Sequence, residues 1–232
     1  EQLNTSSKQP YFMTFFTGST HSPFVISDGA YYSQKLQLFK NKNNADFISS
    51  NEKYLRTILF ADDAIRDFIE SYKKRDDYEN TIFIITGDHP MSEIPRDGEL
   101  RKYHVPLIIY SPKLKKPKVY TQMVSHLDLS TTILTFLENY TTSFPKETAS
   151  LGYSLFPSNK KTSHKYAFMD GNRAMYEYYS DGYFLRKDQV FKVNKDLSLT
   201  EIQNDKLKER LKKELENFKT INYRTSFENK II

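Results

Sequence analysis

Hydrophobic and polar positions follow two patterns in the first two thirds of this chain. Residues 11–17, 81–87 and 104–112 are short stretches rich in apolar, β-branched and aromatic side chains, and each runs into Gly, Ser or Pro. Such stretches have apolar side chains at both odd and even positions, which is typical of strands covered on both faces of a sheet. Residues 52–74 and 125–140 instead place apolar side chains every three or four positions, which predicts two amphipathic helices.

The last third of the chain has a different pattern. Short aromatic stretches between residues 166 and 194 are separated by Asp-Gly pairs at 170–171 and 181–182, and Asp-Gly is a strong local indication of a β-hairpin. Residues 198–222 are highly charged, with a leucine stripe at helical spacing formed by Leu207, Leu211 and Leu215. These features predict an antiparallel meander followed by a charged terminal helix.

The order of elements predicts an α/β fold. We expect a sandwich in which a mostly parallel sheet is flanked by helices, followed by the C-terminal meander and helix. Residues 1–160 would form part of one α/β domain, and residues 161–232 would be an extension packed on that domain.

Composition limits the kinds of protein that fit this fold. A hydrophobic content of 38% supports a folded globular chain, and the absence of cysteine excludes disulfides and cysteine-ligated zinc. No apolar run approaches the roughly 18 residues of a membrane-spanning helix. The net charge is +5, with 34 Lys and Arg interspersed among 29 Asp and Glu. We interpret this excess as diffuse and expect no nucleic acid partner.

Polar residues suited to chemistry follow two of the predicted strands. His21 follows the first strand in GSTHSP, and Asp88 and His89 follow the second in GDHP. Ligands of open α/β sheets bind beyond the carboxyl ends of strands. One oxygen donor and one nitrogen donor suit zinc or manganese, if the chain bends near Pro90 so that both reach one ion. The alternative is a turn that Asp88 caps and in which His89 packs.

Four motifs in order resemble the alkaline phosphatase/sulfatase superfamily. They are YFMTFFTGSTHSPF, TIFIITGDHP, RKYHVPLIIYSP and VSHLDLSTTIL, and the similarity covers residues 10–157. The chain is most similar to the lipoteichoic acid synthase branch of sulfatase-like phosphotransferases. The resemblance implies a metal-dependent phosphotransferase or hydrolase acting on phosphate or sulfate esters, by phosphoglycerol-type transfer or sulfate ester hydrolysis.

The resemblance also assigns roles to single residues. Asp88 and His89 would be ligands of one divalent metal, with manganese or zinc favoured over magnesium or calcium. His21 would bind the anionic oxygens of a phosphate- or sulfate-ester substrate carried by a lipid or a glycan. His104 and His126 would lie at the rim of the site or would orient a ligand through the ring N–H. Asp128 is interpreted as a helix cap.

The chain departs from the family pattern at two points. Pro90 stands where most members have Gly after the Asp-His pair. The family's nucleophile, a Thr, Ser or formylglycine, would lie upstream of this chain. We therefore interpret the start EQLNTSSKQPYF, which lacks an initiating Met, as the beginning of a fragment that is inactive alone.

Two further expectations concern the surroundings of the protein. The family branch implies upstream membrane helices and a catalytic domain outside the cytoplasm, in the periplasm or at the cell surface. A different class of function stays open, namely a non-catalytic module that binds a polyanion or a partner protein. The basic composition and the charged helix near the C-terminus favour that alternative.

Overall fold

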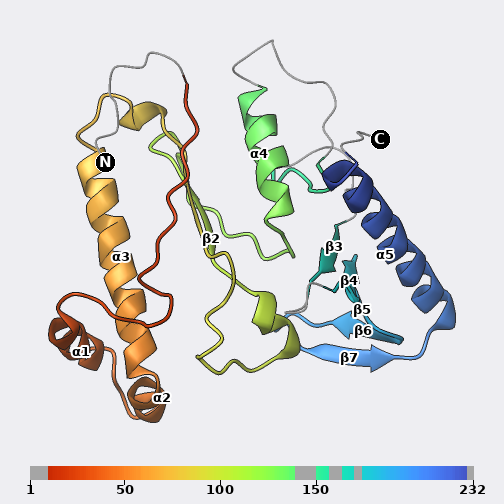
Figure 1. Cartoon of the computed structure of the whole chain (residues 1–232), viewed down its shortest axis with the longest axis horizontal. Coiled ribbons are helices and arrows are strands. Elements are labelled where there is room, and N and C mark those ends of the chain that lie inside the picture. Colours follow the sequence, from red (N-terminus) through yellow and green to blue (C-terminus); the bar gives the residue numbers. More distant parts are fainter. Residues whose placement is uncertain (1–9, 139–149, 157–163, 170–173, 229–232) are drawn as a thin grey trace. The chain divides into compact units, whose positions relative to one another are not determined.

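The computed structural model describes residues 10–138, 150–156, 164–169 and 174–228 (Figure 1). The chain divides into two compact units. Unit 1 contains the described residues up to Arg96 and the segment Tyr103–Lys116, and unit 2 contains Asp97–Lys102 and the described residues from Pro117 onwards. The domain boundary expected after residue 160 falls outside the described residues and stays a prediction.

Unit 1 contains three α-helices. They are α1 (Gly29–Gln37), α2 (Ala45–Ser50) and α3 (Glu52–Tyr72), and the short 3₁₀ helix η1 (Tyr78–Asn80) follows. Helix α3 confirms the helix expected over residues 52–74. Its apolar side packs through aromatic rings, with Phe60 edge-on to Tyr32 of α1 at 5.6 Å between ring centroids. Tyr72 at its last turn lies 5.0 Å from the ring of Phe83.

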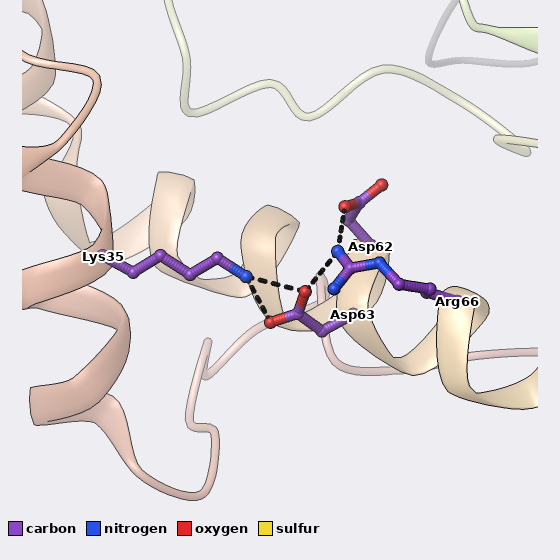
Figure 2. A network of polar contacts seen from close by, with 4 residues as sticks. All are labelled: Lys35, Asp62, Asp63 and Arg66. Atoms are coloured by element: carbon purple, nitrogen blue, oxygen red, sulfur yellow. Dashed lines mark hydrogen bonds and ion pairs between the residues drawn. The ribbon is translucent and has the colours of Figure 1, made fainter.

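A polar network joins α1 to α3 (Figure 2). Lys35 of α1 donates to Asp63 of α3 at 2.7 Å, and Arg66 donates to the same carboxylate at 2.6 Å. Arg66 also reaches Asp62 at 3.2 Å, one turn earlier on α3. The guanidinium and the ammonium both lower the pKa of Asp63, with the hydrogen bond from Lys35 the larger cause. The network therefore ties the two helices through one shared, charged carboxylate.

The strands of unit 1 correct the expected parallel sheet. Strands β1 (Phe83–Thr86) and β2 (Leu107–Tyr110) pair antiparallel, with Phe83 opposite Tyr110 and Thr86 opposite Leu107. A parallel pair needs a crossover that carries the chain back to the start of the first strand. Here the connection returns beside the end of β1, where the hydroxyl of Thr86 donates to the Pro106 carbonyl at 2.8 Å. Among the described residues, both sheets are entirely antiparallel.

Residues 11–17 are the second correction. The segment is not assigned as a strand, and its side chains are largely exposed, with Phe16 at 85%. The segment contacts the rest of unit 1 at two points: the Tyr11 hydroxyl donates to Asp77 at 2.7 Å, and the ring of Phe15 lies 5.3 Å from that of Phe68 of α3. The apolar pattern predicted a covered strand, but the segment pairs with no described strand.

Unit 2 contains the predicted meander. Strands β3 (Lys165–Phe168), β4 (Glu177–Ser180), β5 (Tyr183–Arg186), β6 (Gln189–Val193) and β7 (Leu199–Ile202) pair antiparallel in chain order. The Asp181-Gly182 turn joins β4 to β5, and both residues have positive φ, 50° and 89°. A two-residue hairpin turn of this kind requires such angles, which Asp and Gly tolerate. The other Asp-Gly pair, at 170–171, lies outside the described residues.

Helix α5 (Asp205–Ser226) covers this sheet and completes the core of unit 2 (Figure 1). It begins later than the predicted residue 198, because residues 199–202 pair with β6 instead. The side chain of Asn204 caps its start by accepting the N–H of Leu207 at 2.9 Å. The predicted leucine stripe faces inward, and its members Leu211 and Leu215 pack on Tyr178, Leu185 and Val190.

Helix α4 (Leu127–Leu137) also belongs to unit 2 and confirms the helix expected between residues 125 and 140. The segment 150–156 runs against its first turn. Gly152 is required there, because a Cβ at this position would lie 1.9 Å from the carbonyl oxygen of Leu127. None of the helices formed by described residues is long and apolar enough to cross a membrane.

Candidate functional site

The end of β1 brings Asp88 and His89 together. The chain bends directly after the strand, so the two side chains lie on the same side. The Nε2 atom of His89 lies 3.7 Å from an Asp88 carboxylate oxygen, and the side chains are 69% and 60% exposed. The second carboxylate oxygen of Asp88 accepts the backbone N–H of His89 at 2.9 Å, which stabilises the bend.

The hydrogen bond of the other ring nitrogen decides which atom of His89 is open to a ligand. Nδ1 lies 2.9 Å from the carbonyl oxygen of Pro90. A carbonyl can only accept, so Nδ1 carries the proton, and in the neutral ring Nε2 is left with its lone pair. This is the arrangement in which proteins present histidine to a metal. It also gives Pro90 a role, because its carbonyl orients the imidazole.

The geometry of the pair fits one divalent ion. Two donors that are 3.7 Å apart and each about 2.1 Å from a common ion subtend about 120° at that ion. The donor set, one carboxylate oxygen and one imidazole nitrogen, suits zinc or manganese. The expected alternative of a packed His89 does not match its exposure, whereas Asp88 does cap the turn through one oxygen.

The described residues supply only these two donors. They contain no group of three or more His, Asp, Glu or Cys side chains that could hold an ion. His21 and His104 therefore do not join Asp88 and His89 as ligands within the described chain. An ion needs at least four donors, so the remaining ones would come from other residues, water or substrate.

His21 lies in an exposed turn after residues 11–17. Its backbone N–H bonds to the carbonyl of Gly18 at 3.0 Å, and its carbonyl accepts the N–H of Phe24 at 2.8 Å. Phe24 is buried and packs edge-on against Tyr54 of α3, which anchors the loop. The His21 Nδ1 lies 3.0 Å from the Ser22 carbonyl, so in His21, as in His89, Nδ1 carries a proton that a backbone carbonyl accepts.

The remaining histidines differ in their surroundings. His104 is exposed just before β2, and its carbonyl accepts a hydrogen bond from Arg96 at 3.0 Å. His126 is exposed at the start of α4 in unit 2. His164, which its polar neighbours in the sequence suggest is solvent-exposed, is instead partly buried, with Nδ1 3.0 Å from the hydroxyl of Tyr166.

The N-cap of α4 is His126, which makes no side-chain cap hydrogen bond, so the expected cap role of Asp128 is wrong, and Asp128 has a different structural role in the first turn. It is fully buried at 0% exposure, and its carboxylate accepts three hydrogen bonds. The donors are the N–H of Ser125 at 2.8 Å, the N–H of Tyr153 at 2.7 Å and the hydroxyl of Tyr166 at 2.8 Å. Asp128 thus joins the start of α4, the segment 150–156 and strand β3. The sequence suggested a cap instead, because the donors Tyr153 and Tyr166 are distant from Asp128 in the chain.

Burial around this carboxylate also affects Tyr166. Desolvation and then the charge of Asp128 raise the pKa of the Tyr166 hydroxyl well above its ordinary value. The hydroxyl therefore stays protonated and continues to donate to Asp128. The ring stacks on Tyr179 of β4 at 6.1 Å, so the same side chain anchors the helix and the sheet of unit 2.

Comparisons with known proteins agree with the resemblance seen in the motifs. The sulfatase family model matches residues 1–140, more than half of the chain. The lipoteichoic acid synthase-like protein YvgJ of Bacillus subtilis (strain 168) is 26% identical over 152 residues, covering 57% of this chain and 23% of the relative. The lipoteichoic acid synthase of Staphylococcus aureus (strain USA300) is 27% identical over 82 residues, covering 35% of this chain and 12% of the relative.

The match to these relatives is partial. The chain spans less than a quarter of the length of either of them. No solved structure matches the chain. The family assignment itself depends on the match over residues 1–140, which includes His21, Asp88, His89 and His104. This chain belongs to the sulfatase family.

Proposed function

We propose that this chain is part of a metal-dependent enzyme that transfers or hydrolyses phosphate or sulfate esters, and that Asp88 and His89 are two of its metal ligands. The observation that carries the proposal is the orientation of His89. Its Nδ1 is held by the Pro90 carbonyl, which leaves Nε2 beside the Asp88 carboxylate. Membership of the sulfatase family and the likeness to lipoteichoic acid synthases support an ester of phosphate or sulfate as substrate.

Asp88 and His89 divide the work of holding the ion. Asp88 contributes a negative charge and one oxygen, while its other oxygen keeps the turn closed. His89 contributes a neutral nitrogen whose direction is set by Pro90. A bound divalent ion, manganese or zinc in our proposal, would polarise the ester oxygens and favour ionisation of an attacking hydroxyl.

His21 would hold the anionic oxygens of the substrate. Its Nδ1 already donates to the Ser22 carbonyl, so Nε2 can donate to an anion only when the ring is protonated. We therefore propose that His21 binds the ester as an imidazolium, which adds a positive charge to the hydrogen bond. His104 and His126 are proposed to contribute at the rim or by orienting a ligand.

The rest of the site would come from outside the chain. The nucleophile, a Thr or Ser, would lie upstream, and the intact protein would be anchored by upstream membrane helices with this region outside the cytoplasm. A lipid- or glycan-linked phosphate ester is the substrate class that we favour. The chain alone would then bind metal weakly and turn over no ester.

Two measurements test this proposal. In a longer protein that includes the upstream segment, Asp88→Ala and His89→Ala should each lower phosphodiester turnover by at least about a hundredfold, because a ligand is removed from the ion. In the present chain, Mn²⁺ should broaden the imidazole NMR resonances of His89 selectively, and Asp88→Ala should reduce that broadening.

Glu93→Ala is the matched control, since Glu93 is an exposed carboxylate in the same loop. It should leave both turnover and manganese broadening unchanged. Normal turnover of either ligand variant would refute the metal site. Equal broadening in the Asp88→Ala and Glu93→Ala variants would show that manganese responds only to loop charge.

A further inference from the structure

The net positive charge of this chain is concentrated in one stretch. Residues 101–127 contain six Lys and Arg and no Asp or Glu. The whole chain has 34 Lys and Arg and 29 Asp and Glu. Outside residues 101–127 there are therefore 28 Lys and Arg and 29 Asp and Glu, which gives a net charge of −1. The interpretation of a diffuse excess is therefore wrong, and a count of acidic residues along the chain is enough to show it.

Four of these cations lie in the six residues 113–118, shortly after β2, and we call the segment 113–120 the lysine loop (Figure 1). All its residues are exposed. Lys113 donates to Asn80 at 2.8 Å, whereas Lys115, Lys116 and Lys118 form no ion pair with a described residue. These three ammonium groups are therefore available to anions from outside the described chain.

The loop also exposes apolar side chains between the lysines. Leu114, Val119 and Tyr120 are exposed, at 52%, 86% and 41%. Ser111 is buried, and its carbonyl accepts the N–H of Leu114 at 3.0 Å, with Pro112 at the second position of the turn. The turn thus directs Leu114 away from the strand. Lys118 lies over the Tyr120 ring at 4.5 Å, so the two project together.

We propose that the lysine loop binds the surface of a bilayer containing anionic phospholipids. Lysine ammonium groups near such a surface are attracted by the phosphates, and clusters of four or more are typical of peripheral membrane contacts. Aliphatic and tyrosine side chains beside them enter the interfacial region, where their apolar parts leave water.

The exposed apolar side chains favour a bilayer over a soluble polyanion. A dissolved polyanion would neutralise the lysines but would leave Leu114 and Val119 in water. All eight residues belong to one continuous stretch, within which unit 1 ends at Lys116 and unit 2 continues from Pro117. It is also independent of the proposed metal site, because none of its residues is a proposed metal or substrate ligand.

Vesicle co-sedimentation of the purified chain tests the proposal. Vesicles of phosphatidylcholine and phosphatidylglycerol in equal parts should bind the chain, and vesicles of phosphatidylcholine alone should not. The triple variant Lys115→Glu, Lys116→Glu, Lys118→Glu should lower the partition coefficient by at least about tenfold, because three attractive charges become repulsive.

A second triple variant controls for net charge. Lys42→Glu, Lys74→Glu, Lys206→Glu changes three exposed lysines elsewhere and lowers the net charge from +5 by the same amount. It should retain most of the vesicle binding, with far-UV circular dichroism confirming that both triple variants are folded. Equal loss in the two triple variants would overturn the proposal, as would absence of binding by the parent chain.

A double variant separates a bilayer from a polyanion. Leu114→Ser with Val119→Ser keeps every charge and should lower binding to the anionic vesicles several-fold. Its binding to soluble polyphosphate should equal that of the parent chain. Unchanged vesicle binding by this variant, or a parent chain that binds polyphosphate but not vesicles, would assign the loop to soluble polyanions and refute the membrane contact.

Discussion

Two aspartates within two positions of a histidine in the sequence have opposite environments. Asp128 of unit 2 is fully buried and accepts hydrogen bonds from Ser125, Tyr153 and Tyr166. Asp88 of unit 1 is 60% exposed, accepts one backbone N–H and directs its other oxygen toward His89 Nε2. Both belong to motifs that resemble the sulfatase superfamily, yet only Asp88 offers an atom that another group can reach.

This difference in burial shows that Asp128 stabilises the fold, whereas Asp88 is available to bind a ligand. A buried carboxylate with all its oxygens bonded stabilises the structure, since burying it without those partners would cost several kcal/mol. An exposed carboxylate beside an imidazole nitrogen with a directed lone pair contributes little to folding. Such a pair has donor atoms that an ion can reach, which is why we place the proposed metal at Asp88 and not at Asp128.

Removing the buried carboxylate should have the largest effect on stability. Asp128→Ala would leave two partly buried N–H groups and one buried hydroxyl without their acceptor. We expect the free energy of unfolding of unit 2 to fall by about 3–5 kcal/mol. Urea-dependent hydrogen exchange of the amides in β3 and α4 would measure this change.

Asp88→Ala is the natural control for that measurement, because it removes a carboxylate from an exposed turn. It should leave the protection of both units close to that of the parent chain. If Asp88→Ala destabilised unit 1 as much as Asp128→Ala destabilised unit 2, Asp88 would be a structural residue and the contrast between the two aspartates would fail.

Two glycines near these aspartates differ in the space available for a side chain. A Cβ on Gly152 would lie 1.9 Å from the Leu127 carbonyl oxygen, whereas a Cβ on Gly87 would meet its nearest atoms at 3.5 Å. Gly152→Ala should therefore push the segment 150–156 away from α4 and lower the stability of unit 2 by about 1–3 kcal/mol. Gly87→Ala should change thermal stability little. Equal melting temperatures for the two variants would contradict this packing.

Local patterns in the sequence predicted the elements better than their pairing. The Asp181-Gly182 turn and the leucine stripe of α5 are local features, and the meander and helix follow from them. The antiparallel pairing of β1 with β2 depends on the path of the connection between them, which no short pattern encodes. The same limit applies to residues 11–17, whose apolar pattern is real although no described strand pairs with them.

Site residues show the same limit. Asp88 and His89 are adjacent, so the sequence could propose them together, and the bend at Pro90 was foreseeable. The bond from Tyr166 to Asp128 joins residues 38 positions apart and could not be read from spacing. The lysine loop was different again, because a count along the chain would have located it, and the whole-chain charge concealed it.

The smallest expected effect concerns alkaline stability. Desolvation and Asp128 raise the folded-state pKa of Tyr166, whereas the unfolded chain loses this proton near pH 10. The stabilisation is therefore complete below about pH 10 and is lost as the pH rises toward the folded-state pKa. Tyr166→Phe should lower stability by about 1–2 kcal/mol at neutral pH and make the alkaline decline shallower.

Urea midpoints between about pH 8 and pH 11 would measure that slope. The slope should not vanish in Tyr166→Phe, because burial also raises the pKa of Tyr178 in the same unit. Tyr223→Phe, at an exposed position of α5, is the control and should leave the profile unchanged. Identical slopes in the Tyr166 and Tyr223 variants would mean that the Tyr166 hydroxyl is not buried against Asp128. In that case the contrast with the exposed Asp88 would no longer rest on a closed hydrogen-bond network.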